Sequence, residues 1–115
     1  MKFLASTILA FLLMINFCFA QKKAVEKVMI PTPTVQCDMC KGKIEKWMAH
    51  QDGVQSVKVD IKKKTTTVQY VTARTNEENL KTQIANAGYD AGDVKADEDA
   101  YNRLPKCCKK PAATE

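Results

Sequence analysis

Several residue types are scarce in this chain, and each scarcity narrows the functions that it can have. Histidine occurs only once, as His50, well along a predicted helix from the nearest cysteines, and we assign it no metal role. Nothing resembles a nucleophile with a base and an oxyanion hole, so we predict no enzyme beyond dithiol exchange. Aromatic residues make up 7% of the chain and do not interleave with the basic ones that give a net charge of +5. We therefore predict no nucleic-acid binding.

The first twenty residues have the pattern of an export signal. Lys2 supplies a positive charge, the segment from Phe3 to Phe19 is nearly all apolar, and Cys18 and Ala20 are small residues at the positions that a signal peptidase reads. We predict a signal peptide at 1–20 and a periplasmic or secreted protein. The apolar run approaches the roughly 20 residues that span a bilayer, so an uncleaved anchor stays open.

The remaining residues, 21–115, suffice for one small domain with a thin core. They hold four of the five cysteines. An even number of cysteines in an exported chain usually indicates disulfides. Here the spacing favours another use, because the first pair is close enough to chelate an ion and the second pair is adjacent. The four are Cys37, Cys40, Cys107 and Cys108.

Hydrophobic periodicity predicts six elements in the order strand, helix, strand, strand, helix, strand. This order is typical of a ferredoxin-like βαββαβ fold, in which a four-stranded antiparallel sheet carries both helices on one face. We expect strands at 27–34, 54–62, 66–70 and, weakly, 89–95, a helix at 38–51, and a second helix that begins in the segment 75–78 and stops at Gly88.

The predicted helices each have one apolar face. Asp38 is placed to cap the first helix, whose core positions are Ile44, Trp47 and Met48. The second helix begins with a segment of capping-box form and ends at Gly88. Its predicted core positions are Leu80, Ile84 and Ala87.

The segment Cys37-Asp38-Met39-Cys40 lies where the first strand gives way to the first helix. One sulfur is then on a loop and the other in the first helical turn, where free backbone N–H groups and the helix dipole favour a thiolate. Two thiolates spaced in this way can flank one soft d¹⁰ ion such as Cu(I) or Hg(II). Zinc prefers four ligands.

The chain resembles the heavy-metal-associated domain family, which includes copper chaperones, the metal-binding domains of metal-pumping P-type ATPases and the periplasmic mercury-binding protein of mercury-resistance systems. The resemblance covers about 26–95. It rests on the Cys-x-x-Cys segment after a strand, on Gly53-Val54 followed by Val57-x-Val59, and on Ala87-Gly88-Tyr89-Asp90.

This resemblance implies that Cys37 and Cys40 are the two ligands of a near-linear site and that Tyr89 lies beside it. Where the family usually has Gly-Met, this chain has Thr34, which stiffens the loop, and Val35, which replaces one apolar plug by another. Zinc- and cadmium-binding members often have a carboxylate before the first cysteine, whereas Gln36 stands here, which favours copper.

The predicted function is therefore capture and transfer of Cu(I), or alternatively Hg(II), by Cys37 and Cys40. Family analogy suggests a membrane metal transporter as partner, and we expect a monomer. A dithiol-disulfide oxidoreductase that uses the same two cysteines is one alternative. The chain lacks a Trp-Cys-Gly-Pro-Cys type of sequence, which argues against thioredoxin-like chemistry.

The predicted tail, 96–115, leaves two readings of its vicinal pair. Cys107 and Cys108 either form a disulfide or a disordered end, or 101–105 folds back and brings one or both thiols to Cys37 and Cys40. The second reading makes the protein a metal-sequestering one that uses all four cysteines and extends its range to Zn(II) or Cd(II).

Overall fold

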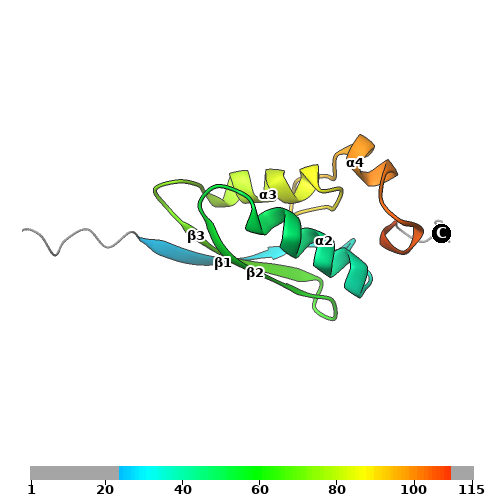
Figure 1. Cartoon of the computed structure of the whole chain (residues 1–115), viewed down its shortest axis with the longest axis horizontal. Helices are drawn as coiled ribbons and strands as arrows, with labels where there is room; N and C mark the ends of the chain where they lie inside the picture. Colours follow the sequence, from blue (N-terminus) through cyan, green and yellow to red (C-terminus); the bar gives the residue numbers. More distant parts are fainter. Residues whose placement is uncertain (1–23, 110–115) are drawn as a thin grey trace, which may run out of the picture.

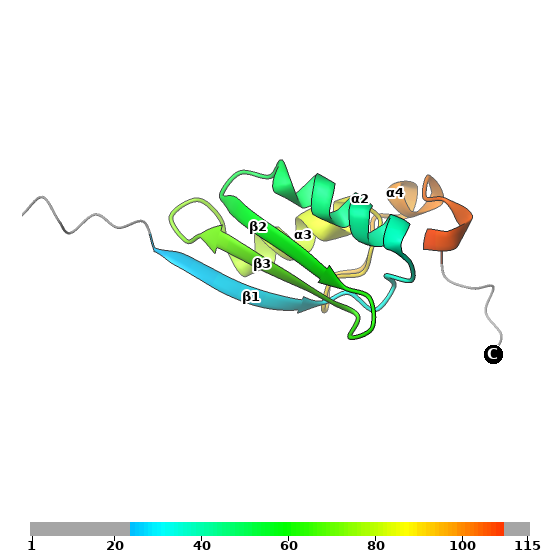
Figure 2. The same cartoon turned by 60° about the horizontal axis from the view of Figure 1, so that its bottom comes forward.

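The computed structural model describes residues 24–109, so the predicted signal peptide lies outside the described residues. Two long helices cover one face of a three-stranded antiparallel sheet (Figure 1). Two short helical segments follow at the end of α2 that carries its N-terminus (Figure 2). The elements are β1 (Val25–Pro31), α2 (Asp38–Ala49), β2 (Val54–Asp60), β3 (Thr65–Val71), α3 (Glu77–Asn86), α4 (Glu98–Asn102) and the 3₁₀ helix η2 (Lys106–Cys108).

The sheet has the order β1-β3-β2, so the central strand is β3. Ile30 of β1 and Val59 of β2 both lie opposite Thr66 of β3, and all three side chains are buried beneath the helices. The Thr66 hydroxyl lies 3.0 Å from that of Thr32, which satisfies two buried polar groups at once. Alternation with a period of two thus placed the three strands, although β1 ends at Pro31 and β2 at Asp60, before the predicted ends at 34 and 62.

The helices pack largely as their periodicity predicts, with three corrections. Ile44, Met48, Leu80 and Ile84 are buried, but Trp47 is 43% exposed because its indole N–H donates to the Gln83 carbonyl at 2.9 Å. In α3, Ala85 is buried while Ala87 is half-buried. Asp38 does not cap α2, because the N-cap residue is Cys37.

The predicted fourth strand is wrong over the described residues. In place of a strand at 89–95, Ala91 and Val94 exchange two backbone hydrogen bonds across a tight turn. A single bond links this turn to β1, from the Gly92 N–H to the Pro31 carbonyl at 2.8 Å. Pro31 and Pro33 have no N–H to donate, so this end of β1 offers little for a ladder.

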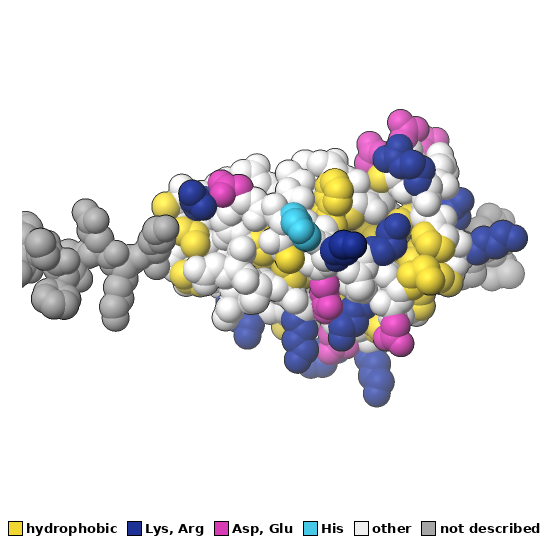
Figure 3. Space-filling view, in the orientation of Figure 1, with side chains coloured by type: hydrophobic (Ala, Val, Ile, Leu, Met, Phe, Trp, Pro, Cys, Tyr) yellow, Lys and Arg dark blue, Asp and Glu magenta, His cyan; other side chains and the backbone are white. Residues whose placement is uncertain are grey.

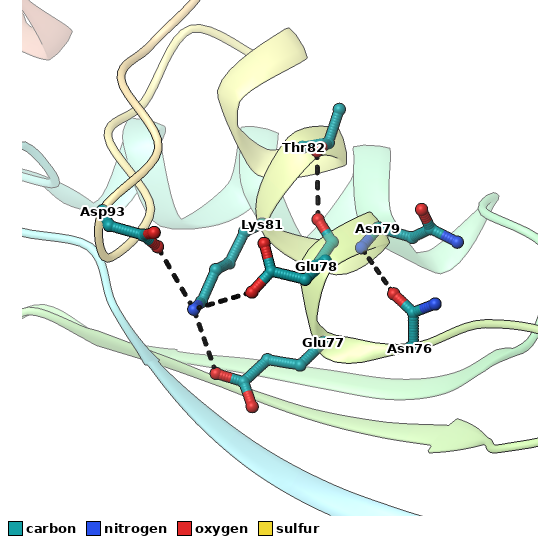
Figure 4. A network of polar contacts seen from close by, with 7 residues as sticks. All are labelled: Asn76, Glu77, Glu78, Asn79, Lys81, Thr82 and Asp93. Atoms are coloured by element: carbon teal, nitrogen blue, oxygen red, sulfur yellow. Dashed lines mark hydrogen bonds and ion pairs between the residues drawn. The ribbon is translucent and has the colours of Figure 1, made fainter.

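A charge cluster around Lys81 holds this turn against α3 (Figure 4). The Lys81 ammonium lies 3.2 Å from carboxylate oxygens of both Glu77 and Asp93, and 3.6 Å from Glu78. Its side chain is only 14% exposed, which leaves the pairs partly shielded from water. The ion pair thereby holds Asp93 at α3, and the segment around it does not continue as a strand along the edge of β1.

The tail folds back against the body of the molecule. Asp97 caps α4 by accepting a hydrogen bond from the Ala100 N–H at 2.8 Å, and Ala100 and Leu104 are each only 6% exposed. Gly88 makes this packing feasible, because a Cβ there would lie 3.1 Å from the Ala100 backbone and from Leu104 Cδ1. Its φ of 104° also favours glycine.

Within 24–109, every helix is too short or too polar to cross a membrane.

Candidate metal centre

The loop between β1 and α2 is fixed from three sides. Val35 is fully buried beneath it, as expected for an apolar plug. Thr34 accepts a hydrogen bond from the Asp90 N–H at 3.1 Å through its hydroxyl. The Lys64 ammonium donates to the Val35 carbonyl, while the Lys64 carbonyl accepts from the Thr32 N–H at 2.8 Å. These contacts hold the backbone that leads into the first cysteine.

Cys37 and Cys40 occupy the start of α2. Cys37 has extended backbone angles, and its carbonyl accepts the first helical hydrogen bond, from the Lys41 N–H at 3.1 Å. Cys40 lies in the first turn, three residues along, so both side chains lie at the helix N-terminus. Their sulfurs are 3.3 Å apart. Cys37 is half-buried and Cys40 fully buried, so the site has one accessible side.

The environment favours a thiolate at Cys37. The backbone N–H of Cys40 is the largest influence, followed by the Cys40 side chain, and together they lower the Cys37 pKa to about 7. Because unpaired N–H groups of the first turn carry partial positive charge, they stabilise the anion over the thiol. Cys37 is therefore about half ionised at neutral pH, in the form that binds soft metals.

The two tail cysteines have opposite environments. Cys108 is fully buried and its sulfur lies 4.0 Å from that of Cys37. Burial raises the pKa of Cys108 to about 12. Cys107 is exposed, and its thiol lies 3.7 Å from Met39 Sδ. All four described cysteines are free thiols. Cys107 and Cys108 are therefore not joined by a disulfide in this structure.

Three sulfurs thus meet at one point. Those of Cys37, Cys40 and Cys108 all lie within 4.8 Å of one another, while Cys107 is outside this group. Its carbonyl oxygen nevertheless covers the pair, at 3.6 Å from Cys37 Sγ and 3.9 Å from Cys40 Sγ. Of the two tail cysteines, the structure places the sulfur of Cys108 beside those of Cys37 and Cys40, and the use of Cys108 as a metal ligand stays a prediction.

Tyr89 lies beside the sulfurs, as the family resemblance implies. It is fully buried, and its hydroxyl makes no hydrogen bond of ordinary geometry within the described residues. Burial, followed by the nearby Cys108 and Cys40 sulfurs, raises the pKa of Tyr89. The phenol is therefore neutral, and an O–H donor stays available next to sulfurs that become anionic when they bind a metal.

The single histidine lies apart from this centre. Basic side chains are spread over the face of the molecule that Figure 3 shows. His50 Nδ1 lies 2.7 Å from the Lys46 carbonyl, within a groove of about 590 Å³ that Lys43, Trp47 and Arg103 also line. No histidine joins the sulfur group in the described part of the chain.

Sequence reasoning missed two features that build the site. One is the contact from Lys64 to the loop, since a run of three lysines predicts a turn but not the direction of one side chain. The other is α4, although Asp97-Glu98-Asp99 is a helix-start signal with an N-cap residue and an acidic first turn. We predicted no helix within 96–115.

Comparison with known proteins gives three findings. A family model described as the heavy-metal-associated domain matches residues 32–90. The copper-exporting P-type ATPase of Staphylococcus aureus (strain Newman) is 32% identical over 80 residues, which are 70% of this chain and 10% of that protein. The corresponding ATPase of Staphylococcus epidermidis is 35% identical over 68 residues, 59% of this chain and 9% of that protein. The chain therefore spans about a tenth of the length of these curated relatives.

Solved structures show the same fold. Oxidised MerP from Ralstonia metallidurans CH34 is 26% identical with a TM-score of 0.57, covering 60% of this chain and 96% of that one. A CopZ metallochaperone is also 26% identical with a TM-score of 0.55, covering 57% of this chain and 98% of that one. The mercury-bound form of MerP, from the bacterial mercury detoxification system, is 25% identical with a TM-score of 0.53, covering 60% and 96%. The tail that carries Cys108 lies beyond the residues that the family model matches.

Proposed function

Because the chain belongs to the heavy-metal-associated domain family, we propose that it captures a soft metal ion, Cu(I) foremost, through Cys37 and Cys40 and hands it on. The observation that carries this proposal is the pair of sulfurs 3.3 Å apart at a helix N-terminus, one of them with a pKa near 7. Such a pair offers thiolate ligands without the full cost of deprotonation.

Transfer proceeds by ligand exchange. A thiolate of the partner forms a bond to the ion, and one bond from the ion to Cys37 or Cys40 then breaks, so the metal keeps its charge and no electron moves. Half-buried Cys37 gives the incoming ligand a side from which to approach. The protein acts as a carrier in this scheme, because the only bonds that change are those between the metal ion and the sulfurs.

The similarities to known proteins favour copper over mercury as the cargo. Copper-exporting ATPases are 32% identical, and a metallochaperone named CopZ is as similar as oxidised MerP, at 26%. Gln36, a neutral residue, stands before the first cysteine. Hg(II) is the alternative cargo, because a pair of thiolates suits both soft ions. We propose a membrane metal exporter as the recipient.

Export of the chain and its location in the periplasm or outside the cell are part of this proposal. They rest on the composition of residues 1–20 alone. The excess of lysine favours an acidic partner surface, with an association rate that falls as salt increases. A rate that is insensitive to ionic strength would argue against such steering.

Anaerobic titration of the reduced protein with Cu(I), in competition with a chelator of known affinity, tests the metal proposal. We expect one ion per chain in the wild type and loss of competitive binding in Cys37→Ser and in Cys40→Ser. Met39→Leu is the matched control, since Met39 lies between the two cysteines but is 54% exposed. Unchanged binding in the serine variants would refute the proposal.

The dithiol oxidoreductase alternative shares the same two sulfurs and needs its own assay. An oxidoreductase would form a Cys37–Cys40 disulfide as it reduces a substrate disulfide, so two protein thiols would be lost for each two thiols released. We expect no turnover with a model disulfide in the presence of a thiol reductant. Sustained turnover that is lost in Cys40→Ser would favour the alternative.

A further inference from the structure

The residues that the family model matches include Cys37 and Cys40. The tail brings a third sulfur next to these two. The match ends at residue 90, and the chain then runs through α4 to η2, which lies at the N-terminal end of α2 in both views (Figures 1 and 2). Cys108, the last residue of η2, is fully buried there. Its sulfur, with those of Cys37 and Cys40, forms the group of three within 4.8 Å.

The spacing of these sulfurs fits three ligands around one ion. With metal–thiolate bonds of about 2.3 Å, three sulfurs in a plane lie about 4.0 Å apart, whereas two sulfurs in a line lie about 4.6 Å apart. The observed distance from Cys37 Sγ to Cys108 Sγ is 4.0 Å. Cys37 and Cys40, at 3.3 Å, must separate by about 0.7 Å for three ligands and by about 1.3 Å for two ligands in a line.

The position of Cys108 is fixed by contacts that do not involve sulfur. The Asp97 N–H donates to the Ala85 carbonyl at 2.9 Å, and Leu104 is buried against the body of the molecule. Beyond the cysteine, the Gln36 side-chain amide donates to the Lys109 carbonyl at 2.9 Å. The tail is thus held on both sides of Cys108, and the residue before Cys37 takes part in holding it.

We propose that Cys108 is the third sulfur ligand of a three-coordinate site for a soft d¹⁰ cation, closed by the tail. The inference rests on the proposed function of Cys37 and Cys40. Cys107 has no such role, because its thiol is exposed and lies outside the group of three sulfurs, although it is 3.9 Å from Cys108 Sγ and 3.7 Å from Met39 Sδ.

A third ligand changes how the ion leaves. When the ion binds, the Cys108 thiol releases its proton to solvent as the metal–sulfur bond forms. When a partner thiolate attacks, its bond to the ion forms as the bond to Cys108 breaks, and Cys108 regains a proton. The ion keeps its charge throughout. The tail must move aside for this step, so the site retains its ion until a competent partner arrives.

X-ray absorption of the Cu(I)-loaded protein tests the coordination number directly. We expect three sulfurs in the wild type and in Cys107→Ser, and two in Cys108→Ser. Competition with a chelator should show at least about a tenfold loss of affinity in Cys108→Ser, and none in Cys107→Ser, which removes the adjacent thiol. Release of Cu(I) to the chelator should be faster in Cys108→Ser. Circular dichroism of the metal-free variants checks that each has folded.

The outcomes separate the two proposals. Two sulfurs around Cu(I) in the wild type, or equal affinity in wild type and Cys108→Ser, would overturn the third ligand and leave the pair of Cys37 and Cys40 intact. No binding by the wild type, or binding that survives Cys37→Ser, would overturn the proposed function as well. Should Cys108→Ser fail to fold, the sulfur count in the wild type alone decides.

Discussion

The two cysteine pairs of this molecule have the same side chains but differ in how their sulfurs are arranged. Cys37 and Cys40 lie three residues apart at a helix N-terminus, so one turn of α2 brings both sulfurs to the same point. Cys107 and Cys108 are adjacent in a 3₁₀ helix, and one sulfur is buried while the other is exposed. Spacing alone brings the two sulfurs of the first pair together. In the second pair only Cys108 is buried, and the packing of the tail decides which of the two sulfurs faces the site.

The pairs also differ in what holds them. The first lies on α2, whose core residues Ile44 and Met48 are fully buried. The second depends on the tail, in which Leu104 belongs to the buried core and Tyr101 packs against that core. Loosening the tail should therefore affect the second pair and leave the first in place. Three predictions test this contrast.

Leu104→Ala should give the largest effect on the tail. Truncating a buried leucine costs about 2–5 kcal/mol, and about 2 kcal/mol of weaker docking makes the open tail roughly thirtyfold more populated. We expect the alkylation of Cys108 by iodoacetamide, followed by mass spectrometry, to accelerate by about that factor. Met29→Ala is the control, since Met29 is 60% exposed on the sheet. Equal protection of Cys108 in Leu104→Ala and wild type would contradict the assigned role of Leu104.

The pH dependence of alkylation should distinguish the two accessible thiols in the metal-free protein. The pKa of Cys37 is lowered to about 7, chiefly by the Cys40 N–H, whereas contact with Cys37 raises the pKa of Cys107 above its ordinary 9.0. The Cys37 rate should rise with pH and level off above about 7, while that of Cys107 should still be rising at pH 9.

At pH 7 a larger fraction of Cys37 than of Cys107 is in the thiolate form, and the lower intrinsic nucleophilicity of Cys37 offsets only part of this difference. We thus expect Cys37 to react faster than Cys107, as measured by fragment-resolved mass spectrometry. Identical pH profiles for the two thiols would show that the helix N-terminus does not activate Cys37.

Lys81→Met should have the smallest effect, at a part of the fold away from both pairs. It removes the ammonium that joins Glu77 to Asp93 (Figure 4), and partly exposed ion pairs contribute little to stability. We expect a lower Tm than in wild type, by less than in Leu104→Ala, and faster hydrogen exchange at the turn of residues 91–94. The difference from wild type should shrink in high salt. An unchanged exchange rate at that turn would show that its own hydrogen bonds suffice.

The strands and long helices were predictable because their signals are local. Alternating apolar residues mark β1, β2 and β3, and an apolar face marks α2 and α3, since each pattern reflects which side chains are buried. The fourth strand failed for a non-local reason. Its apolar residues are few, and the ion pair from Lys81 to Asp93 competes with pairing to an edge that prolines have weakened. The predicted burial of Trp47 was wrong for a similar reason, because its indole N–H donates to the Gln83 carbonyl on α3 at the surface.

By itself the sequence determined the family, the two-residue spacing that brings the sulfurs of Cys37 and Cys40 together, and the helix N-terminus on which they lie. These depend on residues close together in the chain, where backbone geometry fixes the distances. Only the tertiary structure decided that Cys108 joins them and Cys107 does not. That choice depends on how 19 residues after Asp90 pack against α2, α3 and Gly88, and adjacent cysteines carry no local signal that distinguishes the buried sulfur from the exposed one.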